Sequence, residues 1–223
     1  AAGGSPWLEP AEVQALLGAW RIPCAPAGFA ADAEAAVAAA RRAGYPVAVK
    51  LVSATITHKS DVGGVVLGLR DDAGVRAAVA AIERELAARG RRGEMAGVLV
   101  QGMVEGGVET IVGATHDPSF GPVLMFGLGG VSVELLRDVA FRVQPLTDRD
   151  AHELVRAVRG APLLTGWRGA PAADVAALEQ TLLRVSQLVG DLPEIVDMDL
   201  NPLKVLPAGR GCVVVDARIR VGA

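Results

Sequence analysis

The stretch His58–Val65 (HKSDVGGV) lies between two apolar runs, Tyr45–Val52 (YPVAVKLV) and Val65–Leu69 (VVLGL). Both runs are short and rich in valine and leucine, which predicts two strands. The polar loop between them then lies at a sheet edge, where glycine backbone can approach a ligand closely. Backbone N–H groups and a lysine ammonium both attract phosphate, so this loop favours an anion-binding function.

Composition limits the classes of partner. The chain has 223 residues, of which 51% are hydrophobic and 4% aromatic, so one large domain or two small lobes with a core of Ala, Val and Leu is expected. A formal charge of -3 argues against a nucleic-acid partner. No apolar run reaches the roughly 20 residues of a membrane span. Cys24 and Cys212 lack metal or disulfide spacing, which favours a reducing cytoplasm.

Periodicity and turn residues predict alternating helices and strands. The turn-forming stretches 105–107 and 116–119 favour antiparallel hairpins between the apolar runs 96–104, 108–115 and 121–126. The expected class is α+β, with two lobes of mostly antiparallel sheet packed by helices. Residues 1–9 resemble a linker or tail, which suggests a subunit or a domain of something larger. Helices are expected at 10–20, 32–43, 72–90, 148–158 and 174–189, and closing strands at 194–206 and 211–221.

The closing hairpin carries a cluster of oxygen ligands. Asp197, Asp199 and Asn201 share one strand face because side chains alternate with period two. A turn near Gly209 places Asn201 roughly opposite Asp216. Carboxylate and amide oxygens, completed by water and phosphate, are what Mg²⁺ accepts. The alternative is an ordinary polar face of a half-exposed sheet.

Three further side chains each have two interpretations. Lys50 ends an apolar strand, so it either extends along the sheet edge to water or reaches a ligand's phosphate. His58 is a possible phosphoryl acceptor, because a neutral imidazole is a nucleophile near neutral pH, or it is a surface residue. Glu109 begins a strand beside a turn and is either a ligand contact or an ordinary exposed residue.

Taken together, these motifs resemble the ATP-grasp domain of the NDP-forming (ADP-forming) acyl-CoA synthetases, relatives of succinyl-CoA synthetase. The resemblance extends from about Pro10 to Val221. It is carried by Gly44–Lys50, Ser53, His58–Val65, Glu109, Asp117–Pro122, Phe126–Gly130, Asp138–Arg142 and Asp199–Pro202.

The resemblance implies an ATP-grasp domain over residues 10–223, with a small lobe at about 20–104 and the nucleotide, ATP or ADP, sandwiched between two α+β lobes. His58 and Lys50 would be catalytic, and Asn201 and Asp216 would bind Mg²⁺. Contacts to the nucleotide would come from Lys50, Lys59, Ser60, Gln101, Gly102, Met103, Val104 and Glu109, with 101–104 facing the adenine.

The implied activity is phosphoryl transfer between the nucleotide and a phosphohistidine, and His58 is implicated in carrying the group. The CoA-binding and ligase domains of the family do not fit in this chain, so they are expected as partners. The expected protein is thus the nucleotide-binding component of an acid–thiol ligase of the acetate–CoA type, incomplete without those domains. The alternative is a non-catalytic, nucleotide-sensing module of a larger protein such as an N-acetyltransferase fusion.

Overall fold

A computed structural model describes the fold. Among the residues it places, no helix has the length and apolar character needed to cross a membrane. The described residues are 6–53, 55–56, 59–130 and 137–222.

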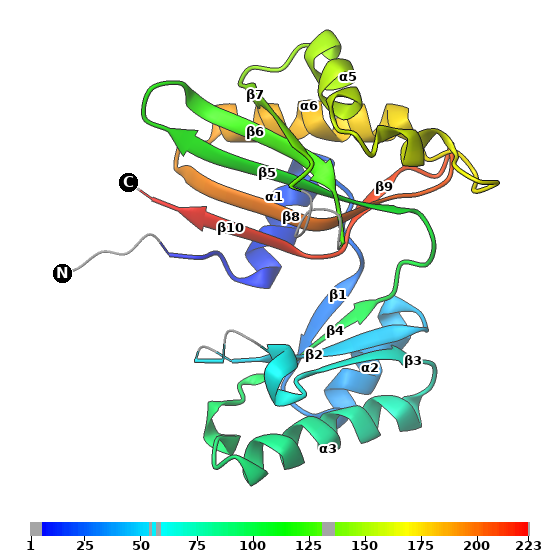
Figure 1. The fold of residues 1–223 in the computed structure, drawn as a ribbon. Helices are drawn as coiled ribbons and strands as arrows, with labels where there is room; N and C mark the ends of the chain where they lie inside the picture. The colour runs from blue at the N-terminus through cyan, green and yellow to red at the C-terminus, as the bar shows by residue number, and fades with distance from the viewer. Residues whose placement is uncertain (1–5, 54, 57–58, 131–136, 223) are drawn as a thin grey trace. The chain divides into compact units, whose positions relative to one another are not determined.

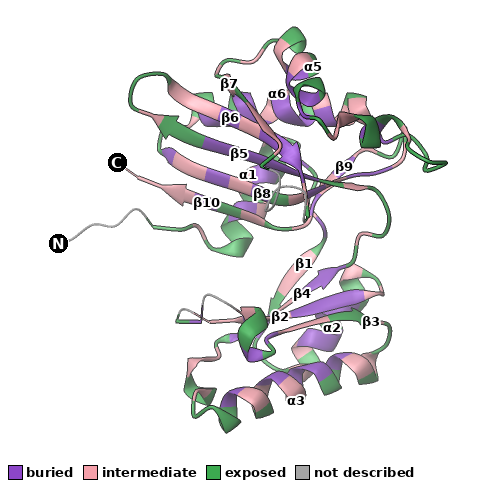
Figure 2. Ribbon diagram, viewed as in Figure 1, coloured by how far each residue is buried: buried purple, intermediate pink, exposed green. Residues whose placement is uncertain are grey.

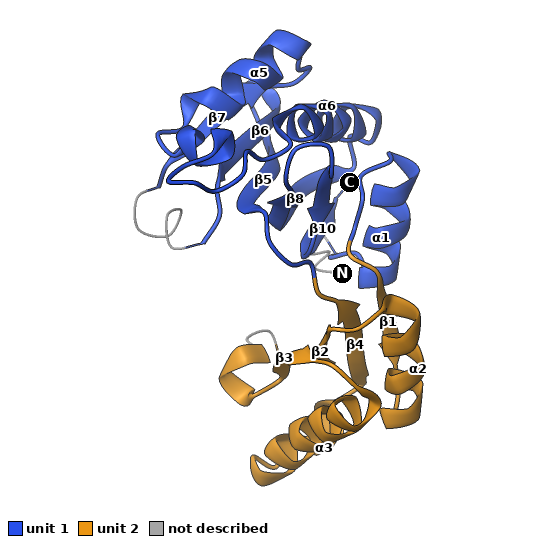
Figure 3. Cartoon of the chain, turned by 90° about the vertical axis from the view of Figure 1, so that its right-hand side faces the viewer, with its two compact units in different colours: residues 1–24, 104–223 blue, residues 25–103 orange. Residues whose placement is uncertain are grey.

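The chain divides into two compact units (Figure 3). The smaller unit is the continuous stretch 25–103, and the larger unit joins residues 1–24 to residues 104–223. Each unit has its own apolar cluster and its own antiparallel sheet with helices, which confirms the α+β class.

The smaller unit contains a four-stranded sheet in the order β1-β4-β2-β3, with helices α2 and α3 on one face (Figure 1). Val47, Val49 and Leu51 of β2 join the helices in the apolar cluster. Successive strand side chains point to opposite faces, so Lys50 lies on the face away from the helices. The bounds are β1 Ala27–Ala30, α2 Ala33–Ala43, β2 Val47–Val52, η1 Lys59–Val62, β3 Val65–Leu69, α3 Asp72–Ala88, η2 Arg92–Glu94 and β4 Gly97–Gly102.

Aspartates begin both long helices of this unit, as predicted. The Asp32 carboxylate accepts a hydrogen bond from Ala35 N at 2.8 Å, and that of Asp71 accepts one from Gly74 N at 2.7 Å. Each cap satisfies a backbone N–H that the first helical turn leaves without a partner, and contributes about 1 kcal/mol. The predicted helices at 32–43 and 72–90 are confirmed.

The larger unit contains a six-stranded sheet in the order β10-β8-β5-β6-β7, with β9 also pairing with β8. Its core combines Phe126 of β6 with Leu17, Leu154 and Leu182 of helices α1, α5 and α6. Figure 2 shows buried residues in purple on the sheet and on these helices. The bounds are α1 Pro10–Ala19, β5 Val108–Asp117, β6 Gly121–Leu128, β7 Val139–Val143, α5 Asp148–Ala157, η3 Ala161–Thr165, α6 Val175–Asp191, β8 Ile195–Val205, β9 Cys212–Val214 and β10 Ala217–Val221.

One of the two predicted hairpins is correct. Strands β5 and β6 pair antiparallel, and the Asp117 carboxylate accepts hydrogen bonds from Ser119 N and Phe120 N to hold the turn. The hairpin predicted at 105–107 is wrong, because β4 pairs with β1 and β2 whereas β5 pairs with β6 and β8. Gly106 and Gly107 do take positive φ values, of 69° and 77°, but they lead the chain from one sheet to the other.

Two further details differ from the sequence predictions. Strand β1 was not predicted, since the segment Ala27–Ala30 (AGFA) is too short and too poor in β-branched residues. The single strand predicted at 211–221 is two strands, β9 and β10, interrupted at Val215 and Asp216. This interruption lies directly at a predicted metal ligand.

Candidate functional site

Lys50 and Gln101 form a polar pair on the smaller sheet. Lys50 Nζ donates to Gln101 Oε1 at 2.7 Å. The strand register pairs Gln101 with Ala48, so Lys50 is its diagonal neighbour on the same face. Gln101 is only 6% exposed and Lys50 is half-buried. The lysine ammonium is therefore held at a fixed position and does not extend freely into water.

The stretch 101–104 was expected to face an adenine. Gly102 N donates to Pro26 O at 2.8 Å, and Met103 N donates to Pro46 O at 2.9 Å. The Gln101 side chain is directed to Lys50. These two N–H groups are engaged within the smaller unit, so a base would be recognised by other atoms of this stretch.

The loop after β2 is fixed at its glycine end. Gly64 N donates to Lys59 O at 2.8 Å, and Gly64 O accepts from Leu51 N at 2.7 Å. A Cβ added at Gly64 would lie 2.8 Å from Lys59 O and 2.9 Å from Leu51 Cβ, so only glycine fits there. The preceding Gly63 has φ of 65°. Gly64 thus allows a close approach, as expected of the loop glycines, but the group it approaches is the chain's own backbone and not a ligand.

Glu109 faces a lysine that the sequence analysis did not consider. The register of β5 and β8 places Glu109 directly opposite Lys204, with Nζ 3.6 Å from Glu109 Oε1. Lys204 Nζ also donates to Val104 O at 2.9 Å, and its side chain is 18% exposed. Strand alternation after Pro202 could have identified Lys204 as a surface residue of the strand, but its pairing with Glu109 depends on strands that are far apart in sequence.

Asn201 and Asp216 lie side by side, as predicted. Asn201 N donates to Asp216 O at 2.9 Å, across the point where β9 ends and β10 begins. The β5–β8 register also shifts beside Asn201, between the partners of Leu200 and Leu203. Both side chains are exposed. Two irregularities in neighbouring strands thus present an amide and a carboxylate together, outside the regular ladder.

Asp199 adds a third oxygen group on the same face of β8. Burial is the main cause that raises the pKa of its carboxyl, and the nearby Asp216 and Asp197 carboxylates raise it further. Arg218, its cross-strand partner, and a hydrogen bond from Asn201 lower the pKa again. The Asn201 side chain thus lies close to the Asp199 carboxyl.

An oxygen-only set of this kind fits Mg²⁺ by its chemistry, because hard cations prefer carboxylate and amide oxygens and keep several waters. Within the described ranges, no group of three or more His, Cys, Asp or Glu side chains is placed to hold a metal ion. Asn201 and Asp216 could therefore supply two ligands, with phosphate and water completing the shell.

The sequence-predicted site residues that the structure describes can now be placed within their units. The structure brings together Lys50 with Gln101, and Asn201 with Asp216; Ser60, in η1, is exposed. His58 lies outside the described residues. The smaller unit carries Lys50, Lys59, Ser60, Gln101, Gly102 and Met103, and the larger unit carries Val104, Glu109, Asn201 and Asp216.

Comparison with known proteins gives concordant matches. A family model described as an ATP-grasp domain matches residues 1–221. The 4-hydroxybutyrate–CoA ligase [ADP-forming] of Nitrosopumilus maritimus is 41% identical, with 96% of this chain and 31% of that protein covered. Subunit beta of acetate–CoA ligase [ADP-forming] II of Pyrococcus furiosus is 41% identical, with 93% of this chain and 89% of that subunit covered.

A solved structure matches over nearly the whole chain. It is the dinucleotide-forming acetyl-coenzyme A synthetase 1 of Ca. Korarchaeum cryptofilum, in complex with coenzyme A and Mg-AMPPCP. The TM-score is 0.85 at 40% identity, and 97% of this chain and 93% of that chain are covered. The chain thus spans about a third of the single-chain relative from Nitrosopumilus but most of the beta subunit and of the solved chain.

Proposed function

The chain belongs to the ATP-grasp domain family, and we propose that it is the nucleotide-binding part of an ADP-forming acyl-CoA ligase. The observation that carries the proposal is its 41% identity to a beta subunit of such a ligase, 89% of which it covers. The two compact units would be the two lobes of the ATP-grasp domain. CoA-binding and ligase parts, on the same polypeptide or on another subunit, would complete the enzyme.

The reaction we propose moves a phosphoryl group between ATP and a histidine. The bond from the γ-phosphorus to the β–γ bridging oxygen breaks, a bond from phosphorus to an imidazole nitrogen forms, and ADP leaves. The reverse direction makes ATP from phosphohistidine and ADP. The related structure in complex with Mg-AMPPCP is described as having a phosphohistidine segment that points towards its nucleotide-binding site, which supports a histidine as the acceptor. His58 is the acceptor or carrier that this chain itself offers.

Lys50 would bind the phosphates. Its ammonium is already held by Gln101 at 2.7 Å, so little side-chain freedom is lost when an anion binds. A cation fixed before the reaction stabilises developing phosphate charge better than one that must reorganise. Gln101 is thus a positioning residue for Lys50 as well as part of the stretch expected near the base.

Asn201 and Asp216 would hold Mg²⁺. When bound, Mg²⁺ neutralises phosphate charge and orients the transferred group. Asn201 would coordinate through its amide oxygen, because Mg²⁺ takes oxygen ligands. Asp199, which lies close to Asn201 and Asp216, would orient these ligands, in the way that outer-shell carboxylates commonly do.

Calorimetry with Mg·ATP tests the binding half of the proposal. Asp216→Ala is expected to weaken Mg·ATP binding by at least about tenfold, or about 1.4 kcal/mol, because a phosphate-bridging cation loses a carboxylate. Asp197→Asn is the control, since Asp197 lies on the same face of β8 as Asn201 but pairs with Arg220, 3.4 Å away. Unchanged affinity in Asp216→Ala would remove this residue from the metal site.

Labelled ATP tests the transfer half. With the CoA-binding and ligase part supplied, label is expected to reach protein histidine as an acid-labile phosphoramidate. Binding of Mg·ATP with no labelled histidine, on either part, would instead support the nucleotide-sensing alternative. The two single-site variants His58→Asn and Lys50→Met separate a carrier from a phosphate ligand, because only the second should weaken nucleotide binding. Related ligases differ in the acid named, so the acyl group lies outside this proposal.

A further inference from the structure

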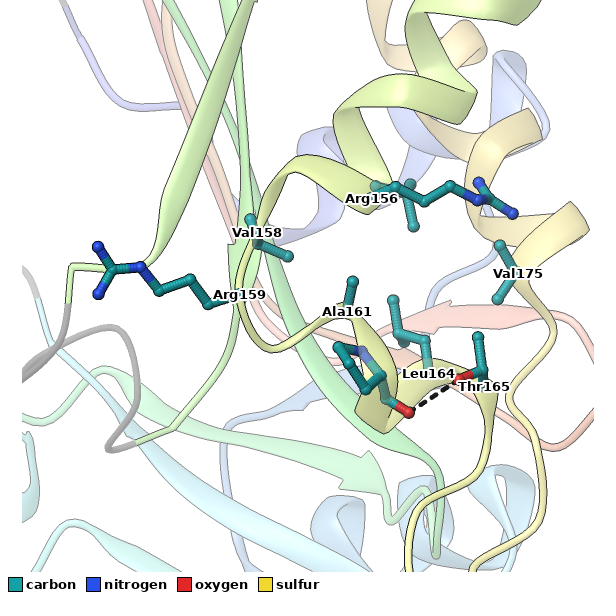
Figure 4. A pocket seen from close by; sticks show the side chains of 9 residues that line it. Arg156, Val158, Arg159, Ala161, Leu164, Thr165 and Val175 are labelled. Carbon is teal, nitrogen blue, oxygen red and sulfur yellow. Dashed lines mark hydrogen bonds between the residues drawn. The ribbon is translucent and has the colours of Figure 1, made fainter.

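The larger unit contains a cavity of about 430 Å³ that shares no residue with the proposed nucleotide site. It lies between the end of α5, the short helix η3 and the first residue of α6 (Figure 4). Its volume is within the range of small-molecule pockets, about 300–1,000 Å³. The lining residues are Val155, Arg156, Val158, Arg159, Ala161, Pro162, Leu164, Thr165 and Val175.

The interior of this cavity is aliphatic. Val155, Val158 and Leu164 are 2%, 3% and 1% exposed, so the innermost part of the lining is apolar and closely packed. The Thr165 hydroxyl, at the edge, donates to Pro162 O at 3.0 Å (dashed in Figure 4). That hydroxyl proton is thereby used within the wall, and the interior suits a hydrocarbon chain better than a polar molecule.

The wall is fixed by residues outside the cavity. The Asp138 carboxylate accepts hydrogen bonds from Arg159 N and Gly160 N, both at 2.8 Å. A Cβ added at Gly160 would lie 2.2 Å from Leu128 Cδ1, so the turn between α5 and η3 packs closely on β6. A pocket whose walls are held in this way loses little conformational entropy when it binds a ligand.

One arginine, Arg156, lies at the rim and already pairs with Glu179. The lining contains two arginines and no carboxylate. Within the described part of the chain, Nη1 makes both hydrogen bonds of the Arg156 guanidinium, to His152 O at 2.9 Å and to Glu179 Oε1 at 2.7 Å. Nη2 and Nε form the other edge of the planar fork, which can receive a second carboxylate. Figure 4 shows the Arg156 guanidinium beside Val175 at the rim, whereas that of Arg159 points away from the cavity.

We propose that this cavity binds a small aliphatic monocarboxylate. The hydrocarbon chain lies on Val155, Val158 and Leu164, and the carboxylate accepts hydrogen bonds from the free edge of the Arg156 guanidinium. Burial of each methylene group favours binding, and the charged hydrogen bond selects an acid over an alcohol or an amine. This site is independent of the proposed phosphoryl transfer.

Titration calorimetry on the full chain tests the proposal with three eight-carbon probes: octanoate, octan-1-ol and octylammonium. Octanoate is expected to saturate one site and to bind about tenfold more tightly than octan-1-ol, the ratio that corresponds to one charge-assisted hydrogen bond. Octylammonium is expected to bind least. Absence of saturable octanoate binding, or equal affinity for octanoate and octan-1-ol, would overturn the proposal.

Two arginine variants make the test specific. Arg156→Gln should lose about tenfold in octanoate affinity and none for octan-1-ol, whereas Arg159→Gln, matched in charge change, should bind octanoate as the native chain does. Ala161→Met, which fills the cavity, should weaken both probes. Arg156 is exposed, so its variant keeps the test valid if Ala161→Met does not fold. Equal losses in the two arginine variants would show non-specific charge attraction and refute the site. Mg·ATP affinity, measured in parallel, reports separately on the proposed function.

Discussion

Replacing Lys50 by methionine removes the ammonium that donates to Gln101 Oε1 at 2.7 Å. Gln101 is 6% exposed, so water reaches its amide poorly and replaces the hydrogen bond from Lys50 only in part. The loss of a hydrogen bond from a charged donor to a buried acceptor costs about 1.5–3 kcal/mol. We expect Lys50→Met to lower the free energy of unfolding by about 2 kcal/mol, and Gln101→Leu to lower it by a similar amount, because the half-buried ammonium then loses its acceptor.

The double variant Lys50→Met with Gln101→Leu removes both partners together. It should cost less than the sum of the single variants by about 1 kcal/mol, since the Lys50–Gln101 hydrogen bond is then lost once and neither member of that bond is left behind. Urea denaturation followed by circular dichroism measures these energies, and an unchanged m-value shows that the comparison is valid. Asp197→Asn, in the other unit, is the control and should add to Lys50→Met without coupling.

Additivity of Lys50→Met and Gln101→Leu within about 0.5 kcal/mol would refute this reasoning. If Lys50 is a phosphate ligand, the double variant should regain part of its stability but not its Mg·ATP binding. We therefore expect the double variant to remain defective in Mg·ATP binding. A double variant that binds Mg·ATP as the native chain does would show that Lys50 is a structural residue.

Three other predictions concern the loop, an ion pair and the thiols. Gly64→Ala should lower the urea midpoint, with a loss of about 1–3 kcal/mol from overpacking, and an unchanged midpoint would contradict the close approach. The Arg91 guanidinium and the Thr55 hydroxyl hold the pKa of Glu94 at about 2, against an ordinary value of 4.5, so the folded state binds fewer protons and stability should fall as pH is lowered through this window. Glu94→Gln should make the thermal melting temperature depend less steeply on pH between these values. An unaltered slope would show that this carboxyl does not cause the pH dependence. Burial raises the pKa of Cys24 to about 11 and of Cys212 to about 12, so both thiols should react slowly with a disulfide reagent at pH 8 and rapidly in urea; rapid reaction of the native chain would contradict this burial.

Local chemistry was sufficient to predict several elements. Asp32 and Asp71 cap helices where the sequence placed helix starts, because a cap involves residues only three positions apart. The β5–β6 turn follows from Asp117 for the same reason. The alternation along β8 placed Asn201 and Asp216 together, since a hairpin transmits register over a short distance.

Contacts between distant segments could not be predicted in this way. Turn residues specify a change of direction but not the partner of the next strand, so Gly106 and Gly107 predicted a hairpin that does not exist. The pairing of β5 with β8 depends on the whole core, and with it the contact of Glu109 with Lys204 was missed. The interruption at Asp216 likewise arises because β9 and β10 pair separately with β8, which the sequence of residues 211–221 alone does not show.

The smaller unit is one uninterrupted stretch of chain whose two ends are neighbours. Ala27 pairs with Gln101, and Gly102 N donates to Pro26 O at 2.8 Å, so the polypeptide enters and leaves the unit at adjacent points. A gene segment that encodes residues 25–103 is therefore a natural cassette. Residues 24 and 104 could be joined by a short linker to express the larger unit alone, and the cassette could be exchanged between relatives without cutting either sheet.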